Sequence, residues 1–436
     1  MFFISCFRPL ETSTVRNVFR QPDQIIRQSM KIGIIKEGKI PSDARVPLVP
    51  WQCAVLKEEH GIDVVVQRSD VRCFTDEEYA ASGIELVDDL AGCDLLMGVK
   101  EVPVQDLLRE KAYLFFSHTI KKQPQNRKLL QAVLKKGIRL IDYELLKDDS
   151  GCRLIAFGHY AGMVGAHNGL WTYGHRTGLF SLKRMRDFHE YKQAREAYGD
   201  LRLPPLRVVL TGTGRVSTGA RQVLQDMGIQ QVNPDDFLQA EFKTPVFTQL
   251  SGQHYLSRKD GQPFVRQEFY EDPQLYVCDF EPYFRKADIM INGIFWDSRS
   301  PVFFTREDML RPDFIIKVIA DITCDIAPAS SVPSTLRPST IDDPVYGYDP
   351  RLGTEVPPFT PHGIDVMAID NLPSEMPRDA SAAFGNQFIE HILPEFFRPN
   401  SNVLHRATIA LEGRLNDPFF YLRDYAESKE EMEQHV

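Results

Sequence analysis

The sequence is poor in cysteine, in long apolar runs and in positive charge, and each shortage excludes a class of protein. Its seven cysteines are scattered, odd in number and free of any CxxC or Cys/His pattern, so we predict free thiols in a reducing compartment and no metal site. No apolar stretch approaches the roughly 20 residues that a membrane-spanning helix needs. The formal net charge of −9 argues against nucleic acid or an anionic membrane as the main partner. These shortages favour a cytoplasmic protein.

The first residues do not match the pattern that follows them. Residues 1–30 carry four arginines and two acids but lack the clean apolar core of a signal peptide, whereas MKIGIIKEGK resembles the start of a first strand. We therefore expect an N-terminal extension over residues 1–30, and we favour a loosely attached segment over a transit peptide.

From residue 31 onward, apolar runs alternate with amphipathic stretches. KIGIIKE, IDVVVQR, DLLMGV, AYLFFSH and RLIDYE are separated by helical patterns such as WQCAVLKEEHG, and a second series begins at LRVVLTG. Continuous apolar strands separated by helices are typical of parallel sheets covered on both faces. This predicts an α/β protein with two Rossmann-like domains whose parallel sheets flank an interdomain cleft. We assign residues 31–165 and 374–436 to a substrate (catalytic) domain, and residues 166–373 to a nucleotide-binding domain with an insertion near 240–280.

A glycine-rich loop opens the second series. In RVVLTGTGRVSTGA, Gly212 and Gly214 fit the first two glycines of a dinucleotide fingerprint, which give a tight turn and a close approach to a pyrophosphate. The third position is Ser217 rather than glycine, so a structural turn is the alternative. The next strand is predicted to end in VNPDDF, with Asn233 where an acid would bind a ribose 2′-hydroxyl, and this leaves NAD or NADP open.

Ionisable residues end three consecutive strands of the first series. Lys100 and Glu101 follow DLLMGV, His118 follows AYLFFS and Glu144 follows RLID, while Arg45 comes soon after the first strand. Since the carboxyl ends of parallel strands meet at one sheet edge, we expect a cleft suited to proton transfer on carboxylate-bearing substrates. The alternative for each residue is an ordinary solvated strand end, a packing histidine or a surface ion pair.

Eight ordered motifs resemble one superfamily. DARVPLVP, GVKEVP, AYLFFSHTIKKQ, RLIDYELL, AFGHYAG, VVLTGTGRVSTGA, MINGIFW and IDNLPSEMPRDAS are similar to alanine dehydrogenases and transhydrogenases, and most similar to lysine-forming saccharopine dehydrogenases and lysine–2-oxoglutarate reductases. The resemblance implies two Rossmann-like domains and the NAD(P)H-dependent condensation of L-lysine with 2-oxoglutarate to saccharopine, which is reversible. Because no saccharopine-cleaving half follows, we expect a stand-alone enzyme, and the oligomeric state stays open.

The resemblance also implies roles for individual residues. It assigns Lys100 and His118 to acid/base catalysis. Substrate binding is expected at Arg45, Glu101, Lys121, Glu144, Arg153 and Tyr160. Cofactor binding is expected at Gly212, Gly214, Arg215, Val216, Asn292, Gly293, Asp325, Asn371 and Leu372, with Asp370 in the same loop as the last two.

Two other functions stay open from the sequence. An alanine dehydrogenase-like enzyme would use ammonia in place of the lysine amine. A non-catalytic nucleotide-binding regulator on the same fold would have little use for the pair Lys100 and His118. The sequence departs from the family pattern at Ser217 and at Cys324, in CDIAPASS.

Overall fold

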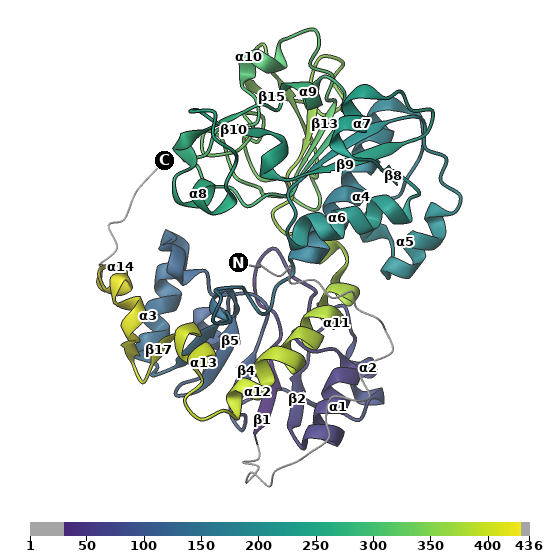
Figure 1. Cartoon of the computed structure of the whole chain (residues 1–436). Coiled ribbons are helices and arrows are strands. Elements are labelled where there is room, and N and C mark those ends of the chain that lie inside the picture. Colours follow the sequence, from purple (N-terminus) through teal and green to yellow (C-terminus); the bar gives the residue numbers. More distant parts are fainter. Residues whose placement is uncertain (1–29, 429–436) are drawn as a thin grey trace.

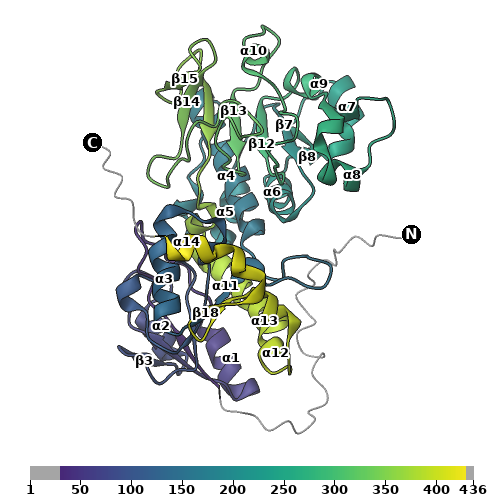
Figure 2. The ribbon, with the colours of Figure 1, turned by 90° about the vertical axis from the view of Figure 1, so that its left-hand side faces the viewer.

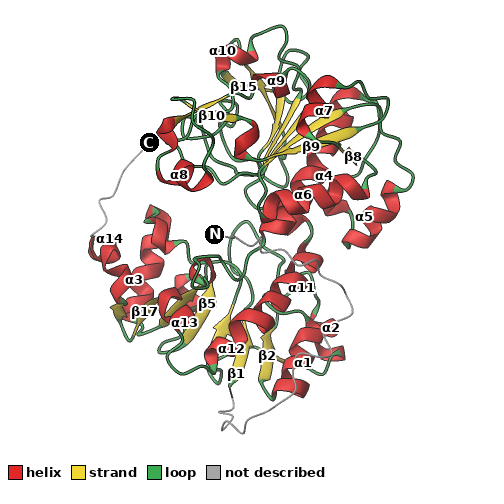
Figure 3. Cartoon of the chain, in the orientation of Figure 1, coloured by secondary structure: helices red, strands yellow, loops and turns green. Residues whose placement is uncertain are grey.

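The computed structural model describes residues 30–428 and contains two lobes, each built around an eight-stranded sheet with helices on both faces (Figures 1 and 3). The predicted α/β fold with two Rossmann-like units is confirmed, although both sheets also contain antiparallel strands that the sequence patterns did not indicate. The predicted extension, apart from Met30, lies outside the described residues. Within residues 30–428, no helix has both the length and the apolar character needed to cross a membrane.

The first lobe consists of strands β1–β6, β17 and β18 with the helices packed on them. Six parallel strands have the spatial order 3-2-1-4-5-6, and β17 adds to β6 in the antiparallel sense. The strands are β1 (Lys31–Ile34), β2 (Asp63–Gln67), β3 (Glu85–Val87), β4 (Leu95–Met97), β5 (Ala112–Phe115), β6 (Arg139–Asp142), β17 (Thr408–Leu411) and β18 (Arg414–Leu415).

The C-terminal part of the chain returns to this first sheet. One face is covered by the apolar side chains of α1 and of α11 to α13, and the other by those of α3 and α14. Figure 2 shows these late helices on the same lobe as the first strands. The helices are α1 (Pro50–His60), α2 (Asp76–Ala81), α3 (Arg127–Lys135), α11 (Pro377–Gln387), α12 (Leu393–Phe396), α13 (Asn402–Ala407) and α14 (Arg423–Glu427).

The second lobe consists of strands β7–β16 and their helices. Its strand order is β8-β9-β7-β12-β13-β16, followed by the antiparallel strands β14 and β15. The strands are β7 (Arg207–Thr211), β8 (Gln230–Gln231), β9 (Val246–Leu250), β10 (Leu256–Arg258), β11 (Tyr276–Cys278), β12 (Ile289–Asn292), β13 (Val318–Asp321), β14 (Tyr346–Asp349), β15 (Thr354–Val356) and β16 (Ile364–Met367). The helices are α4 (Gly158–Thr177), α5 (Tyr191–Tyr198), α6 (Arg215–Asp226), α7 (Pro234–Gln239), α8 (Arg266–Glu271), α9 (Glu281–Phe284) and α10 (Arg306–Met309).

The strand beside β7 is not the one that the sequence pattern suggested. β8, which leads into VNPDDF, is a two-residue edge strand with both glutamines exposed, and β9 lies between it and β7. The range 240–280, predicted as an insertion, therefore begins with a strand of the sheet, and the separate hairpin is formed by β10 and β11. Short-range periodicity predicts a strand but not the strand that it pairs with, so the sequence pattern could not give the order β8-β9-β7.

Helix α4 packs very closely on α6. A Cβ atom at Gly162 would lie 1.7 Å from the Val216 carbonyl oxygen, and one at Gly219 would lie 1.9 Å from the His159 carbonyl oxygen. Contacts of that length exclude any larger residue, so both glycines are required for the two helix backbones to touch. The start of α4 also joins the lobes, since Tyr160 packs against the apolar cores of both.

Candidate active site

The strand order of the first sheet reverses between β1 and β4, which is where ligands bind in open α/β sheets. The end of β4 is held there by Glu37, from the loop after β1. Its carboxylate accepts the backbone N–H groups of Val99 at 2.5 Å and Lys100 at 3.0 Å. Burial raises the pKa of Glu37 to about 7. Lys100, which follows the apolar run of β4, thus lies at the strand end where ligands bind in such sheets.

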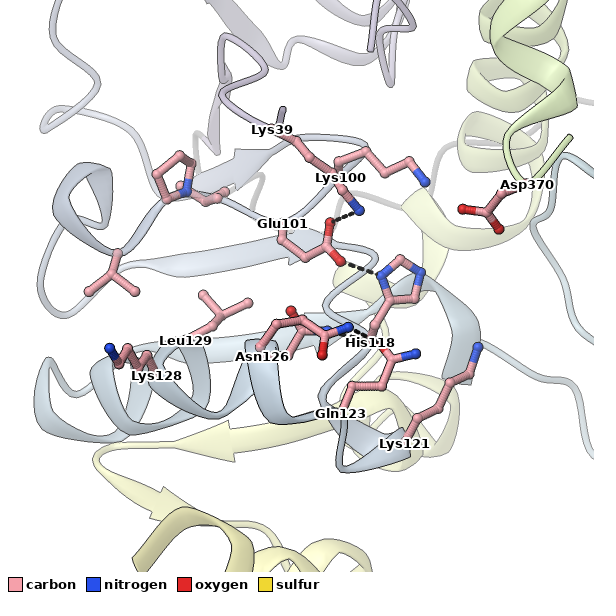
Figure 4. A pocket seen from close by; sticks show the side chains of 14 residues that line it. Lys39, Lys100, Glu101, His118, Lys121, Gln123, Asn126, Lys128, Leu129 and Asp370 are labelled. Carbon is pink, nitrogen blue, oxygen red and sulfur yellow. Dashed lines mark hydrogen bonds and ion pairs between the residues drawn. The ribbon is translucent and has the colours of Figure 1, made fainter. Parts of the chain in front are cut away.

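A pocket of about 740 Å³ lies at this edge (Figure 4). Figure 4 shows the side chains of Lys100, His118 and Asp370 turned toward the same space. Asp370 comes from the segment after the second sheet, so the pocket includes residues of both parts of the chain. The lining residues that carry polar groups are Lys39, Lys100, Glu101, His118, Lys121, Gln123, Gln125, Asn126, Lys128 and Asp370.

Three ionisable side chains form a chain of contacts across the pocket. Lys39 Nζ lies 2.9 Å from one oxygen of Glu101, and His118 Nδ1 lies 2.5 Å from the other. Burial disfavours the charge on Glu101, but the hydrogen bonds from His118 and Lys39 outweigh it and lower its pKa to about 2. The backbone of His118 is in the left-handed region, with φ of 52°, which a residue with a Cβ adopts rarely and often at functional sites.

Lys100 lies in surroundings that favour its neutral form. The side chain is half-buried, and burial together with the positive charge of Arg45 lowers its pKa below the ordinary lysine value. A lysine of this kind can accept a proton closer to neutral pH than a solvated one.

A second ionic group centres on Glu144. Lys121 Nζ and Arg153 Nη2 lie 3.3 Å and 3.2 Å from the same carboxylate oxygen. Burial opposes ionisation of Glu144, but these two cations lower its pKa overall. The guanidinium of Arg215, the first residue of α6, also donates to the backbone oxygen of Arg153 and so connects the two lobes.

Arg45 is more enclosed than the sequence suggested. It is 2% exposed, and Asp43 accepts from its Nε at 3.0 Å and its Nη2 at 2.6 Å. The same Nη2 donates to Asn371 at 2.8 Å, and the guanidinium lies 4.2 Å from the ring centre of Phe157. Burial disfavours ionised Asp43, yet Arg45 holds its pKa well below the usual value. The structure therefore brings Arg45 and Asn371 together, but neither is among the residues that line the pocket.

The glycine loop of the second lobe has the geometry of a phosphate cradle. Gly212 has φ of 93°, and a Cβ there would lie 2.7 Å from the Gly293 carbonyl oxygen. Gly214 precedes the 12-residue helix α6, and among the described residues no heavy atom lies within 4 Å of where its Cβ would be. Ser217, in place of the third glycine, is buried and donates to the backbone oxygens of Thr211 or Gly293, at 3.0 and 3.1 Å. Open space before a helix N-terminus fits a pyrophosphate.

The remaining predicted cofactor residues fall into two groups. Asn292 is fully buried, donates to Asp321 and Ser331 and accepts from Thr211, so it fixes three strand ends together. Leu372 is likewise part of the apolar core. Gly293 is buried against the Gly212 loop, whereas Val216 and Asp325 are half-buried, and burial raises the pKa of Asp325.

Sequence reasoning missed several residues of the site. Glu37, Lys39 and Asp43 all lie in the loop after β1, and Gln123 and Asn126 lie near the start of α3. The signal was available in KEGK, because polar residues after a first strand lie at the point where strand order reverses.

Comparison with known proteins agrees with this geometry. Residues 33–164 match the family described as "Alanine dehydrogenase/PNT, N-terminal domain". The mitochondrial alpha-aminoadipic semialdehyde synthase of Rattus norvegicus is 31% identical over 90% of this chain and 47% of its own length, so the chain spans about half of that relative. The saccharopine dehydrogenase [NAD(+), L-lysine-forming] of Emericella nidulans is 30% identical over 87% of this chain and 96% of its own.

Two solved structures share the fold. An L-alanine dehydrogenase gives a TM-score of 0.59 at 17% identity, covering 88% of this chain and 96% of its own. A transhydrogenase from Sinorhizobium meliloti gives 0.56 at 15% identity, covering 88% and 99%. The chain is therefore an α/β protein with the two-lobe fold of these structures. Within that class, the chain belongs to the alanine dehydrogenase and transhydrogenase family, in the branch of the lysine-forming saccharopine dehydrogenases.

Proposed function

We propose that the chain catalyses the reductive condensation of L-lysine with 2-oxoglutarate to saccharopine with a reduced nicotinamide dinucleotide, and the reverse reaction. One observation carries the proposal: Lys100, His118 and Glu101 line a single pocket where the strand order reverses. The names of the relatives support the substrates, and four relatives covered over 90% or more of their own length are named for NAD(+), which supports a nicotinamide dinucleotide as the cofactor. In this proposal residues 31–165 and 374–436 form the substrate domain, and residues 166–373 form the cofactor domain.

The proton transfers would be divided between Lys100 and His118. In the condensation, the ε-amine of the substrate lysine loses a proton, attacks the ketone carbon and gives a carbinolamine. Water then leaves with acid assistance, and hydride supplied by the dinucleotide reduces the imine. We assign the first proton to Lys100, because burial and Arg45 enlarge its neutral fraction. We assign protonation of the leaving hydroxyl to His118, whose Nδ1 is held by Glu101.

The remaining charges suit substrates that carry three carboxylates. Lys121 and Arg153 share Glu144 and could each turn to a substrate carboxylate, where arginine binds in a bidentate manner. Arg45 contributes mainly through its field, since Asp43 already occupies two of its nitrogens. Tyr160, at the junction of the two cores, would set the approach of the lobes rather than contact substrate.

The test is a comparison of substrates under one assay. Absorbance of NADH and of NADPH is followed with 2-oxoglutarate plus lysine, and separately with pyruvate plus ammonium. We expect oxidation with the first pair. Oxidation only with the second pair would make the chain an alanine dehydrogenase-like enzyme. Dinucleotide binding without oxidation by either pair would favour a regulator.

A further inference from the structure

The strand order of the second sheet determines which residues can contact the 2′ substituent of the adenosine ribose. A pyrophosphate over the Gly212 loop places the adenosine ribose beyond the end of the strand next to β7. That strand is β9, whose residue Leu250 pairs with Thr211 and accepts the N–H of Gly212 at 2.8 Å. Asn233, at the end of β8, lies one strand farther away, about 5 Å more.

Asn233 is also occupied by its own helix. Its side-chain oxygen accepts the Asp236 N–H at 2.8 Å, and its amide donates to the Asp236 carboxylate at 2.6 Å. Both ends of the amide are therefore used in capping α7, and the acids nearby belong to that cap. This end of the sheet has neither the position nor the free groups that a ribose contact requires.

The residues after β9 have the position, and one of them has a ring nitrogen on the exposed side. Ser251 and His254 lie in a turn in which His254 Nδ1 accepts the backbone N–H of Ser251 at 2.9 Å and lies 3.1 Å from its hydroxyl. The other ring nitrogen faces the exposed amide of Gln253, 3.4 Å away. The ring is thus fixed at Nδ1, while Nε2 lies on the exposed side of the turn.

The turn is held rigidly against the loop and the hairpin. Gln249 donates to the Gly212 carbonyl oxygen at 2.9 Å, and Tyr283 donates to the His254 carbonyl oxygen at 3.3 Å. A Cβ at Gly252 would lie 2.8 Å from the ring of Phe264, so the hairpin packs directly on the turn. A side chain in this turn therefore keeps a fixed position relative to a bound pyrophosphate.

We propose that the turn Ser251–His254, and not the segment after β8, determines the choice between NAD(H) and NADP(H), and that it accepts a 2′-phosphate. The inference rests on the proposed use of a nicotinamide dinucleotide. Enzymes that require NAD place a carboxylate at this point to bind the 2′-hydroxyl and repel a phosphate. The stretch LSGQHYL contains no acid, and His254 Nε2, which carries the ring proton when Nδ1 accepts the Ser251 N–H, can donate to a phosphate oxygen.

Binding of adenosine fragments tests the proposal without turnover. Dissociation constants of 5′-AMP and of adenosine 2′,5′-bisphosphate are measured by calorimetry on the full chain. We expect the wild-type protein to bind the bisphosphate no more than tenfold more weakly than 5′-AMP. Ser251→Asp should weaken the bisphosphate by tenfold or more and change 5′-AMP by less than threefold. His254→Ala should weaken the bisphosphate severalfold. The matched control Asn233→Asp puts the same charge after β8 and should leave the ratio unchanged.

The outcomes separate this inference from the proposed function. If neither fragment binds, the dinucleotide role itself fails. If both bind, but Asn233→Asp alters the ratio while Ser251→Asp does not, the location of the selective residues is wrong. If the wild-type protein rejects the bisphosphate by more than a hundredfold, the acceptance of a 2′-phosphate is wrong.

Discussion

The two lobes share the same layered architecture. They differ in strand order and in the kinds of residue at their strand ends. Numbered along the chain, the parallel strands of the first sheet have the order 3-2-1-4-5-6, whereas those of the second have 2-3-1-4-5-6. The first sheet ends in charged side chains at its reversal point, among them Lys100, Glu101 and His118. The second ends in glycines and in buried, hydrogen-bonded Asn292. In the proposed function, the first strand end moves protons and the second lets a ligand approach the backbone.

The difference lies in how each end satisfies its polar groups. In the first lobe the charged side chains form ion pairs and hydrogen bonds with one another, as Glu101 does with Lys39 and His118. In the second lobe the side chains of Thr211 and Asn292 are satisfied by neighbouring residues of the lobe, and the loop residues Gly212, Thr213 and Gly214 carry no charge. Changes at each end should therefore have different consequences, catalytic in the first and binding in the second.

The largest expected effect is on turnover, from a change in the first lobe. Lys100→Met removes the amine but keeps the volume of the side chain, and we expect kcat to fall by about 10²- to 10⁴-fold, the usual contribution of a general acid or base. The affinity for dinucleotide, measured by fluorescence titration, should stay within threefold. Lys36→Met, on an exposed residue of the same lobe, serves as the control and should leave kcat unchanged. Equal losses in both variants, or none in Lys100→Met, would remove Lys100 from catalysis.

The corresponding change in the second lobe should affect binding. Gly212→Ala places a Cβ 2.7 Å from the Gly293 carbonyl oxygen and strains a backbone with φ of 93°. At a cost of about 1–3 kcal/mol, dinucleotide binding should weaken by roughly 10- to 100-fold. Gly92→Ala, at a position with open space around it, is the control. Unchanged affinity in the Gly212 variant would mean that the loop does not contact the ligand.

Glu37→Gln tests how the first lobe holds its strand end. The nitrogen of the amide cannot accept a hydrogen bond, so one of the two N–H groups that Glu37 accepts loses its partner, and we expect a loss of about 1–3 kcal/mol in the free energy of unfolding at pH 5. The measurement is urea unfolding followed by circular dichroism. A variant as stable as the wild-type protein would show that the contact does not support β4.

The same residue gives a dependence on pH. Its pKa is raised to about 7 in the folded protein, so the unfolded chain releases this proton first as the pH rises. The contribution of Glu37 to stability is therefore complete below about pH 4.5 and is lost as the pH rises toward 7. The stability of the wild-type protein minus that of Glu37→Gln should accordingly fall between pH 5 and pH 8. A difference that stays constant, or rises, would contradict the raised pKa.

The smallest expected effect is at the departure from the glycine fingerprint. Ser217→Ala removes a buried hydroxyl that donates to a backbone oxygen, at a cost of about 1 kcal/mol in stability. Affinity for dinucleotide should change by less than threefold, because the hydroxyl faces the strand ends and not the open side of the loop. A larger loss of affinity than of stability would give Ser217 a direct role in binding.

Local sequence patterns predicted the features that depend on residues close together in the chain, and not those that depend on which strands pair. Lys100 and His118 were found because each follows an apolar strand, and the ends of parallel strands lie at one edge. Glu37 was missed because its role depends on β1 lying next to β4, a long-range pairing. Asn292 was placed among the cofactor contacts, yet its amide is used by Asp321 and Ser331 in neighbouring parts of the lobe. Periodicity likewise could not show that β9 rather than β8 lies beside β7, since it does not encode strand order.

The return of the C-terminal segment to the first sheet has a consequence for the order of folding during synthesis. The strands of the second sheet are contiguous in the chain, from β7 to β16, so that lobe has all its strands once residue 367 has left the ribosome. The first sheet, although begun earlier, lacks α11 and β17, the strand that pairs with β6, until after the second lobe has been made. The nascent chain would thus carry an uncovered apolar face while the second lobe is being made, a surface that chaperones recognise, and the lobe that is begun first would be completed after the other.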